Sequence, residues 1–208
     1  MVLLESFKGL LPHAWSEPPE QRVHVDAPDA ATTLAQILYR YSYPLVVRAC
    51  SLVLLCIGTD RSIGDALGPL IGTRLSEGGP KAYHVFGTLD NPVHAGNLGE
   101  TIERVRANFE RPFVLAVDAC LGRSESVGML VAGKGSLKPG AGVNKALPAV
   151  GDVYLTGIVN VGGFMEYYVL QNTRLSLVVH MAKVAATAAD IALSHFGDRI
   201  GMQRAAQR

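Results

Sequence analysis

Apolar and polar positions along the chain fall into blocks that predict buried strands followed by amphipathic helices. Residues 52–57 form a continuous apolar run, which is typical of a strand buried on both faces. The run ends at Gly58, and residues 65–75 then place their leucines and isoleucine on one helical face. This block therefore predicts a strand, a glycine-containing loop and a helix, which is half of a βαβ unit.

The same alternation continues along the chain. Further strands are predicted at residues 83–88, 113–117, 127–132 and 153–159, and further helices at residues 29–41, 96–109, 164–170 and 175–196. Pro44 is expected to stop the first of these helices. Alternating β and α elements favour the α/β class with a largely parallel, doubly wound sheet.

The domain organisation follows from these blocks. Residues 29–197 are predicted to form a single α/β domain, and residues 198–208 a C-terminal tail. Residues 1–28 are predicted to be an extended or loosely ordered segment because prolines recur in it. At 208 residues with 49% hydrophobic residues, the chain has the size and apolar content of one compact domain.

Charge and cysteine content narrow the class of partner. The chain carries 19 basic and 18 acidic residues, so no overall field favours nucleic acid or an anionic membrane. Residues 1–9 lack the pattern of a secretory signal, and no uninterrupted apolar run of about 18 residues occurs. The three cysteines, Cys50, Cys56 and Cys120, are expected to be buried thiols in a reducing compartment. We therefore expect a cytoplasmic protein that binds neither nucleic acid nor a membrane.

Two aspartates follow predicted strands and are the main candidates for chemistry. In an open parallel sheet, ligands bind at the carboxyl ends of strands, where Asp65 and Asp118 are predicted to lie. Two carboxylates in a partly dry cleft can act on water as an acid and a base, or can hold a divalent cation. The alternative is that Asp65 caps its helix and Asp118 binds loop N–H groups.

Other polar features carry weaker signals. The loop at residues 58–64 matches neither common phosphate-binding pattern, which disfavours nucleotide binding. A second glycine-rich loop, residues 138–144, could bind a ligand through Asn144 or could be a plain connection. His84, His94 and His180 lack zinc-motif spacing. No G-x-S-x-G motif occurs, and Cys120 is the best of a weak set of nucleophiles.

Four motifs carry a resemblance to a known family. They are Cys56-Ile-Gly-Thr-Asp-Arg-Ser-Ile-Gly-Asp-Ala-Leu-Gly-Pro69, Val117-Asp-Ala-Cys-Leu-Gly122, Lys138-Pro-Gly-Ala-Gly-Val-Asn144 and Thr156-Gly-Ile-Val-Asn-Val161. Together they resemble the YyaC sporulation proteins, over residues 45–196. That family is in turn similar to the germination protease of spore-formers and, more distantly, to the hydrogenase maturation proteases. The resemblance implies a three-layer α/β/α sandwich with a mostly parallel central sheet.

The resemblance also implies roles for single residues. In the germination protease, the Asp-Ala-Leu-Gly-Pro motif and a strand-end Asp-Ala each hold a catalytic aspartate, matched here by Asp65 and Asp118. In the hydrogenase maturation proteases, these two positions contact a metal together with a histidine, for which no equivalent is placed here. The His-Pro-Gly-Ser-Gly of the germination protease becomes Lys138-Pro-Gly-Ala-Gly142. No cofactor is expected on this basis, and a divalent metal between Asp65 and Asp118 is the alternative.

Two hypotheses follow for the function. The first is a sporulation- or germination-associated peptidase, in which Asp65 and Asp118 activate water against a peptide bond of a small spore protein. Substrate-binding or orienting residues would then be Gly58, Asp60, Lys138, Gly140, Asn144 and Asn160. The second is a non-catalytic sporulation factor that keeps the protease-like fold and binds a peptide or protein partner. Both place the protein in a sporulating cell or spore interior and leave open whether it forms a homo-oligomer.

Overall fold

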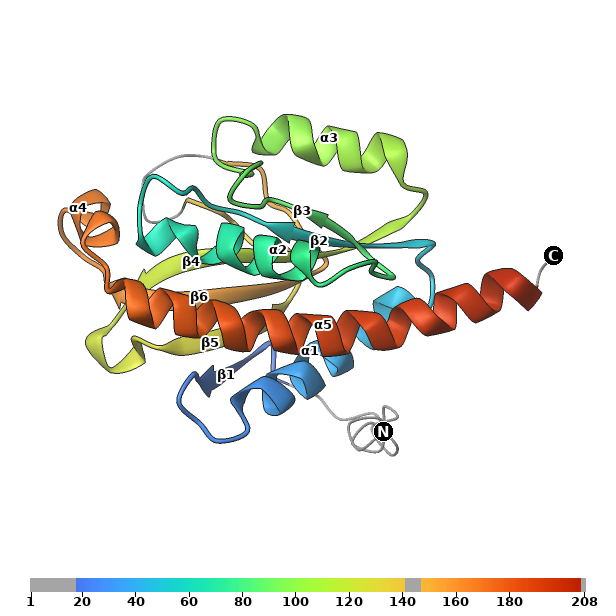
Figure 1. The fold of residues 1–208 in the computed structure, drawn as a ribbon, viewed down its shortest axis with the longest axis horizontal. Helices are drawn as coiled ribbons and strands as arrows, with labels where there is room; N and C mark the ends of the chain where they lie inside the picture. Colours follow the sequence, from blue (N-terminus) through green and yellow to red (C-terminus); the bar gives the residue numbers. More distant parts are fainter. Residues whose placement is uncertain (1–17, 141–146, 207–208) are drawn as a thin grey trace.

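The fold is built on a six-stranded sheet with the order β1-β5-β6-β4-β2-β3 (Figure 1). The computed structural model describes residues 18–140 and 147–206. The strands are β1 (Glu20–His24), β2 (Ser51–Cys56), β3 (His84–Phe86), β4 (Pro112–Gly122), β5 (Met129–Lys134) and β6 (Val153–Val161). Strand β5 is antiparallel to both its neighbours, and all other neighbouring pairs are parallel. The prediction of a mostly parallel sheet is thus confirmed.

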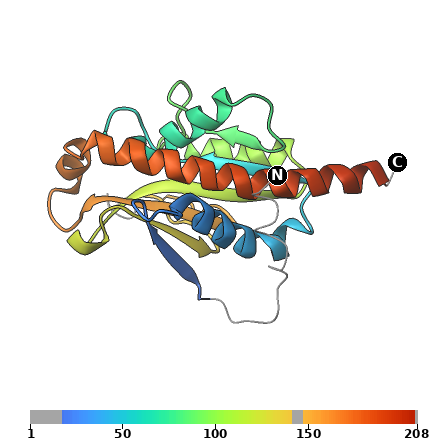
Figure 2. The same cartoon turned by 60° about the horizontal axis from the view of Figure 1, so that its bottom comes forward.

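Helices cover both faces of the sheet. The helices are α1 (Ala30–Val46), α2 (Leu67–Glu77), α3 (Leu98–Asn108), α4 (Glu166–Gln171) and α5 (Leu175–Ala206), with short 3₁₀ turns η2 (Gly64–Ala66) and η3 (Ser124–Ser126). Helices α1, α2 and α5 share one hydrophobic core with the sheet, whereas α3 packs in a second core on the opposite face (Figures 1 and 2). The predicted three-layer α/β/α sandwich is therefore confirmed.

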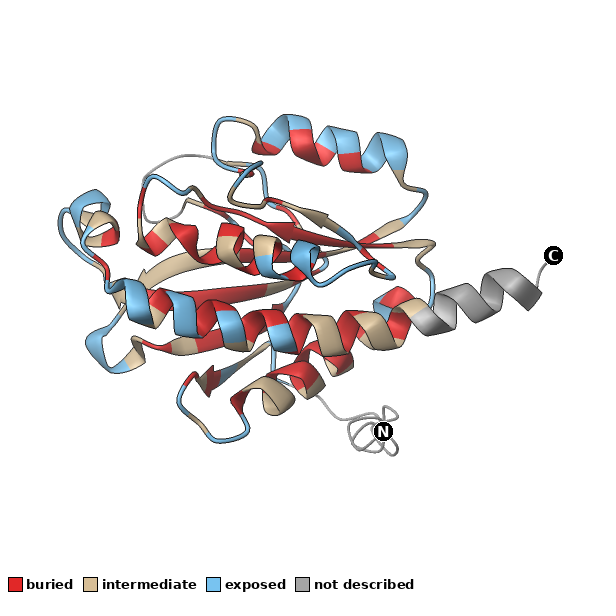
Figure 3. Ribbon diagram, in the orientation of Figure 1, coloured by how far each residue is buried: buried red, intermediate tan, exposed pale blue. Residues whose placement is uncertain are grey.

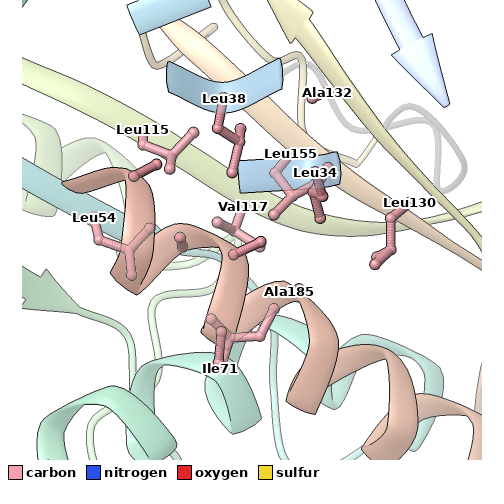
Figure 4. Packing of buried hydrophobic residues seen from close by; sticks show 14 of the residues in the cluster. Leu34, Leu38, Leu54, Ile71, Leu115, Val117, Leu130, Ala132, Leu155 and Ala185 are labelled. Atoms are coloured by element: carbon pink, nitrogen blue, oxygen red, sulfur yellow. The ribbon is translucent and has the colours of Figure 1, made fainter. Parts of the chain in front are cut away.

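The buried run of β2 supplies both cores. Leu54 points into the core with α1, α2 and α5, and its neighbour Leu55 points into the core with α3. This follows from the alternation of side chains along a strand, and it explains why the run is apolar throughout. Buried residues line the sheet and the inner faces of the helices (Figure 3). Figure 4 shows Leu54, Ile71 and Ala185 packed in the first core.

Helix α5 is longer than predicted. The expected helix end near residue 196 is wrong, since the helix continues to Ala206, into the segment predicted as a C-terminal tail. No proline interrupts residues 197–206, and extending an existing helix costs far less than starting one. By length and composition alone, Leu175–Gly197 could also cross a membrane. Here, however, its buried side chains, such as Met181 and Ala185, belong to the first core.

Within the segment predicted to be extended or loosely ordered, residues 20–24 are extended and form β1, an edge strand paired with β5 from Glu20↔Gly133 to His24↔Met129. Residues 1–17 lie outside the described part. Pro44 does not end α1 but lies inside its last turn, and the helix ends at Val46. A proline so close to the C-terminal end removes only one N–H donor, and its φ is compatible with a helix.

Candidate active site

A cavity of about 700 Å³ opens at the carboxyl ends of the parallel strands. Both Asp65 and Asp118 line it, as do four of the other predicted site residues, Gly58, Asp60, Lys138 and Gly140. In Figure 1 this is the edge of the sheet at which the arrowhead of β4, the start of α2 and α4 come together. The two aspartates therefore share one cavity, although they are separated by about fifty residues in the chain.

Asp118 is held within β4 and not in a loop after it. The predicted strand end at residue 117 is wrong, because β4 continues to Gly122 and pairs Asp118 with Thr156 of β6. The Oδ1 atom of Asp118 accepts the N–H of Ala119 at 2.8 Å. A register shift between Cys120 and Leu121 then interrupts the regular pairing, which resumes with Leu121 opposite Asn160. Such bulges re-aim side chains at the edges of sheets and next to sites.

The surroundings of Asp118 favour its protonated form. Burial raises the pKa of Asp118 to about 8, the hydrogen bond from Ala119 opposes this rise, and the charge of Asp65 adds to it. The side chain is partly buried in the cavity wall, where its charged form loses hydration. At neutral pH the Asp118 carboxyl is therefore mainly a proton donor.

Asp65 lies in the 3₁₀ turn η2, immediately before α2. The N-cap positions of η2 and α2 are Ile63 and Ala66, so Asp65 occupies neither, and no side-chain capping hydrogen bond is found there among the described residues. Burial raises the pKa of Asp65, and the Ser62 hydroxyl lowers it. Ser62 is itself buried, and its Oγ atom is close enough to act on Asp65 without a hydrogen bond of good geometry. This hydroxyl therefore favours the ionised form of Asp65, whereas Asp118 has no side-chain donor of this kind.

Gly58 allows the loop between β2 and η2 to close tightly. Its N–H donates to the carbonyl of Val93 at 2.8 Å, and the N–H of Thr59 donates to the carbonyl of Asp65 at 3.1 Å. Gly58 has φ +149, and a Cβ atom there would overlap the carbonyl oxygen of Asp65. Glycine is therefore needed for the backbone approach that holds Asp65 over the end of β2.

Two predicted site residues, Asn144 and Asn160, and the candidate nucleophile Cys120 are considered separately from the six residues above. Asn144 lies outside the described residues. Asn160 is not among the described residues that line the cavity, and its amide binds α4 and the connection between α4 and α5. Its Nδ2 donates to the carbonyl of Val169 and to Thr173 Oγ1, each at 3.3 Å.

Cys120 was the best of the weak candidates for a nucleophile. Burial raises the pKa of Cys120 to about 11, which leaves a protonated thiol that is a poor nucleophile.

A comparison with protein families places the chain. The model of a family described as "Protein of unknown function (DUF1256)" matches residues 22–188. The chain belongs to this family. The match confirms the predicted resemblance to the YyaC proteins, since the uncharacterized protein YyaC of Bacillus subtilis (strain 168) is 58% identical over 135 residues. The aligned part covers 65% of this chain and 66% of YyaC, just under two thirds of that relative.

Among solved structures, the chain is similar to the NiFe hydrogenase maturation protease HycI from Thermococcus kodakarensis KOD1. The identity is 18% and the TM-score 0.46, over 72% of this chain and 96% of HycI. Among residues 18–140 and 147–206, no group of three or more His, Cys, Asp or Glu side chains could hold a metal ion.

Several polar side chains that line the cavity were not predicted as site residues from the sequence. Among them are Arg61, His94, Thr156 and Glu166. Thr156 could have been found as the strand neighbour of Asp118, had the order β4–β6 been known. His94 and Glu166 follow no strand that local periodicity could detect, and they reach the cavity only through tertiary packing.

The elevated pKa of Asp118 predicts that the free energy of unfolding depends on pH. A carboxyl whose folded pKa lies above its unfolded value stabilises the fold at low pH, and this contribution is lost as pH rises. For Asp118 the loss spans from about pH 4 to about pH 8. Denaturant unfolding should therefore show a decrease on the order of 3 kcal/mol between pH 5 and pH 8. Asp118→Asn should remove most of this decrease, and an equal slope in both proteins would contradict the assignment.

Proposed function

We propose that this chain is a peptidase in which Asp65 is the general base and Asp118 the general acid. The observation that carries the proposal is the contrast between the two aspartates in one cavity. Burial raises the pKa of both carboxyl groups; at Asp118 the charge of Asp65 adds to this rise and the pKa reaches about 8, whereas at Asp65 the Ser62 hydroxyl opposes the rise. Two carboxyl groups with different protonation states are what acid–base catalysis of hydrolysis needs.

The proposed reaction balances its protons between these two groups. Asp65 accepts a proton from a water molecule as the oxygen attacks the peptide carbonyl carbon. Asp118 gives its proton to the carbonyl oxygen, which forms a neutral tetrahedral intermediate. As the C–N bond breaks, the protonated Asp65 gives its proton to the leaving amine, and Asp118 takes back the hydroxyl proton as the new carboxyl group forms. Both aspartates then have their starting protonation states.

The rim of the cavity supports a polypeptide as substrate. Glu166 and Leu170 of α4 line the cavity. Phe164, Tyr167 and Tyr168 in the same segment are 82%, 60% and 57% exposed. Contiguous exposed apolar side chains are common where a protein binds another polypeptide and uncommon elsewhere on a surface. The motif resemblance to the germination protease adds support for a small spore protein as the natural substrate, in a sporulating cell or spore.

Cleavage of a complex peptide library tests the proposal. The full chain is incubated with peptides made by digesting a total bacterial protein extract, and new termini are identified by mass spectrometry. We expect recurring cleavage at a narrow set of sequences. Retention of peptides on the immobilised protein with no new termini would contradict the peptidase and favour the second hypothesis, a non-catalytic sporulation factor that binds a peptide. The exposed aromatic segment is compatible with that outcome, because binding needs no turnover.

A further inference from the structure

We propose that His94 binds a carbonyl oxygen of the peptide in the cavity, through a hydrogen bond donated by Nε2–H. The proposal rests on the proposed peptide occupancy of this cavity, but it does not require that the peptide is cleaved. His94 lies in the connection between β3 and α3 and lines the same cavity as Asp65 and Asp118. Its role would be to fix the carbonyl against the aspartate pair.

The backbone holds His94 close to the loop that carries Asp65. Its preceding residue, Val93, forms a parallel bridge with Ile57 at the end of β2. The carbonyl of Val93 accepts the N–H of Gly58 at 2.8 Å. His94 therefore directly follows Val93, which contacts the backbone of the loop after β2. This is the loop that positions Asp65.

Hydrogen bonding selects which ring nitrogen of His94 carries the proton. The Nδ1 atom accepts the backbone N–H of Gly96 at 3.0 Å, so in the neutral imidazole the proton is on Nε2. Within the described part of the chain, no hydrogen bond occupies Nε2. A Cβ atom at residue 96 would lie 3.1 Å from Cε1 and 3.2 Å from Nδ1 of the ring. Glycine thus permits the close approach that fixes the ring.

Asn97 makes the His94 connection rigid. Its Oδ1 accepts the N–H of His94 at 2.8 Å, and its Nδ2 donates to the carbonyl of Pro92 at 3.0 Å. The carbonyl of His94 in turn accepts the N–H groups of Asn97 and Leu98, at 3.0 and 2.9 Å. A donor held in place before the ligand arrives stabilises charge on a carbonyl oxygen more than a mobile donor does.

The two cationic side chains of the cavity lack this anchoring. Arg61 and Lys138 also line the cavity and are exposed, as is His94, but unlike His94 neither has a side-chain hydrogen bond among the described residues. Long flexible side chains lose rotamer entropy when they bind, whereas the imidazole is already oriented. His94 is therefore the preorganised donor that complements the acid Asp118.

Two substitutions of His94 distinguish the role of its Nε2–H donor from that of its Nδ1 acceptor. His94→Asn keeps an acceptor near the position of Nδ1 for the Gly96 N–H but removes the distal donor, whereas His94→Gln keeps a donor near the position of Nε2. We measure kcat and KM on a peptide that the library identifies, and the affinity of the same peptide in an Asp118→Asn background. His94→Asn should lower kcat/KM by about a hundredfold, and His94→Gln should recover much of it. His180→Asn, on the exposed side of α5, is the matched control.

Each outcome decides between the two proposals. Wild-type kinetics and affinity in both His94 variants would overturn the role of His94 and leave the peptidase intact. Equal losses in both variants together with a lower Tm would show a structural role and would also overturn it. If the wild type binds peptides without cleaving them, the peptidase fails, and weaker binding by His94→Asn than by His94→Gln still supports the inference. A wild type that neither cleaves nor retains library peptides contradicts both proposals.

Discussion

Asp118→Asn is expected to lower kcat about a thousandfold on a peptide substrate, because the amide cannot give a proton to the carbonyl oxygen. Its own carbonyl can still accept the N–H of Ala119, so the strand should keep its geometry. Asp65→Asn should cause a loss of similar size, since it removes the group that takes the proton from water. Steady-state cleavage of a library-derived peptide measures both effects.

The two losses should not add. Residues that act as one unit give a double variant about as slow as the slower single variant. We therefore expect Asp65→Asn/Asp118→Asn to resemble Asp118→Asn in kcat. Asp90→Asn serves as the control, because Asp90 is exposed and does not line the cavity. Full activity in either single variant would contradict the shared acid–base role.

Gly58→Ala is expected to destabilise the fold by about 3–5 kcal/mol. A side chain at positive φ costs roughly 1–3 kcal/mol, and forcing atoms into packed surroundings costs about as much again. Here the new Cβ would overlap the Asp65 carbonyl oxygen and lie 2.8 Å from Pro69 Cδ. For a chain of this size the Tm should fall by roughly 10 °C. Activity below the new Tm should fall as well, because η2 must move and carry Asp65 with it.

Gly79→Ala separates backbone strain from overlap. Gly79 also has positive φ, +85, but a Cβ atom there meets nothing within 4 Å. This variant should lose only about 1–2 kcal/mol in denaturant unfolding, with full activity below its Tm. Equal destabilisation at the two positions would show that contact with Asp65 is not what requires glycine at residue 58.

Hydrophobic periodicity was sufficient to predict the central architecture. The apolar run at residues 52–57 indicated a strand buried on both faces, and the structure has β2 there with a core on each side. The aspartates could be located for the same reason, because parallel strands end at one edge of a sheet and the cavity lies at that edge. The shifts of their pKa values could not be predicted, since these depend on burial and on neighbours such as Ser62.

Features that depend on contacts between segments far apart in the chain were not predicted. Strand β1 is five residues long and pairs with β5, which begins more than a hundred residues later, so no local pattern marks it as part of the sheet. The extension of β4 through Asp118 likewise depends on β6, because polar residue 118 interrupts the apolar run that ended the prediction. His94 lacks motif spacing, and its relation to Asp65 arises only from the bridge between Val93 and Ile57.

The pKa of Asp118, followed by carbon NMR of its side-chain carboxyl, tests the central claim most directly and needs no substrate. Burial of Asp118, together with the charge of Asp65, predicts a value of about 8 in the wild type. It also predicts a lower value in Asp65→Asn, because the neighbouring negative charge is gone. A wild-type value near the ordinary aspartate range of about 4, or one that Asp65→Asn leaves unchanged, would contradict an acid–base pair formed by Asp65 and Asp118.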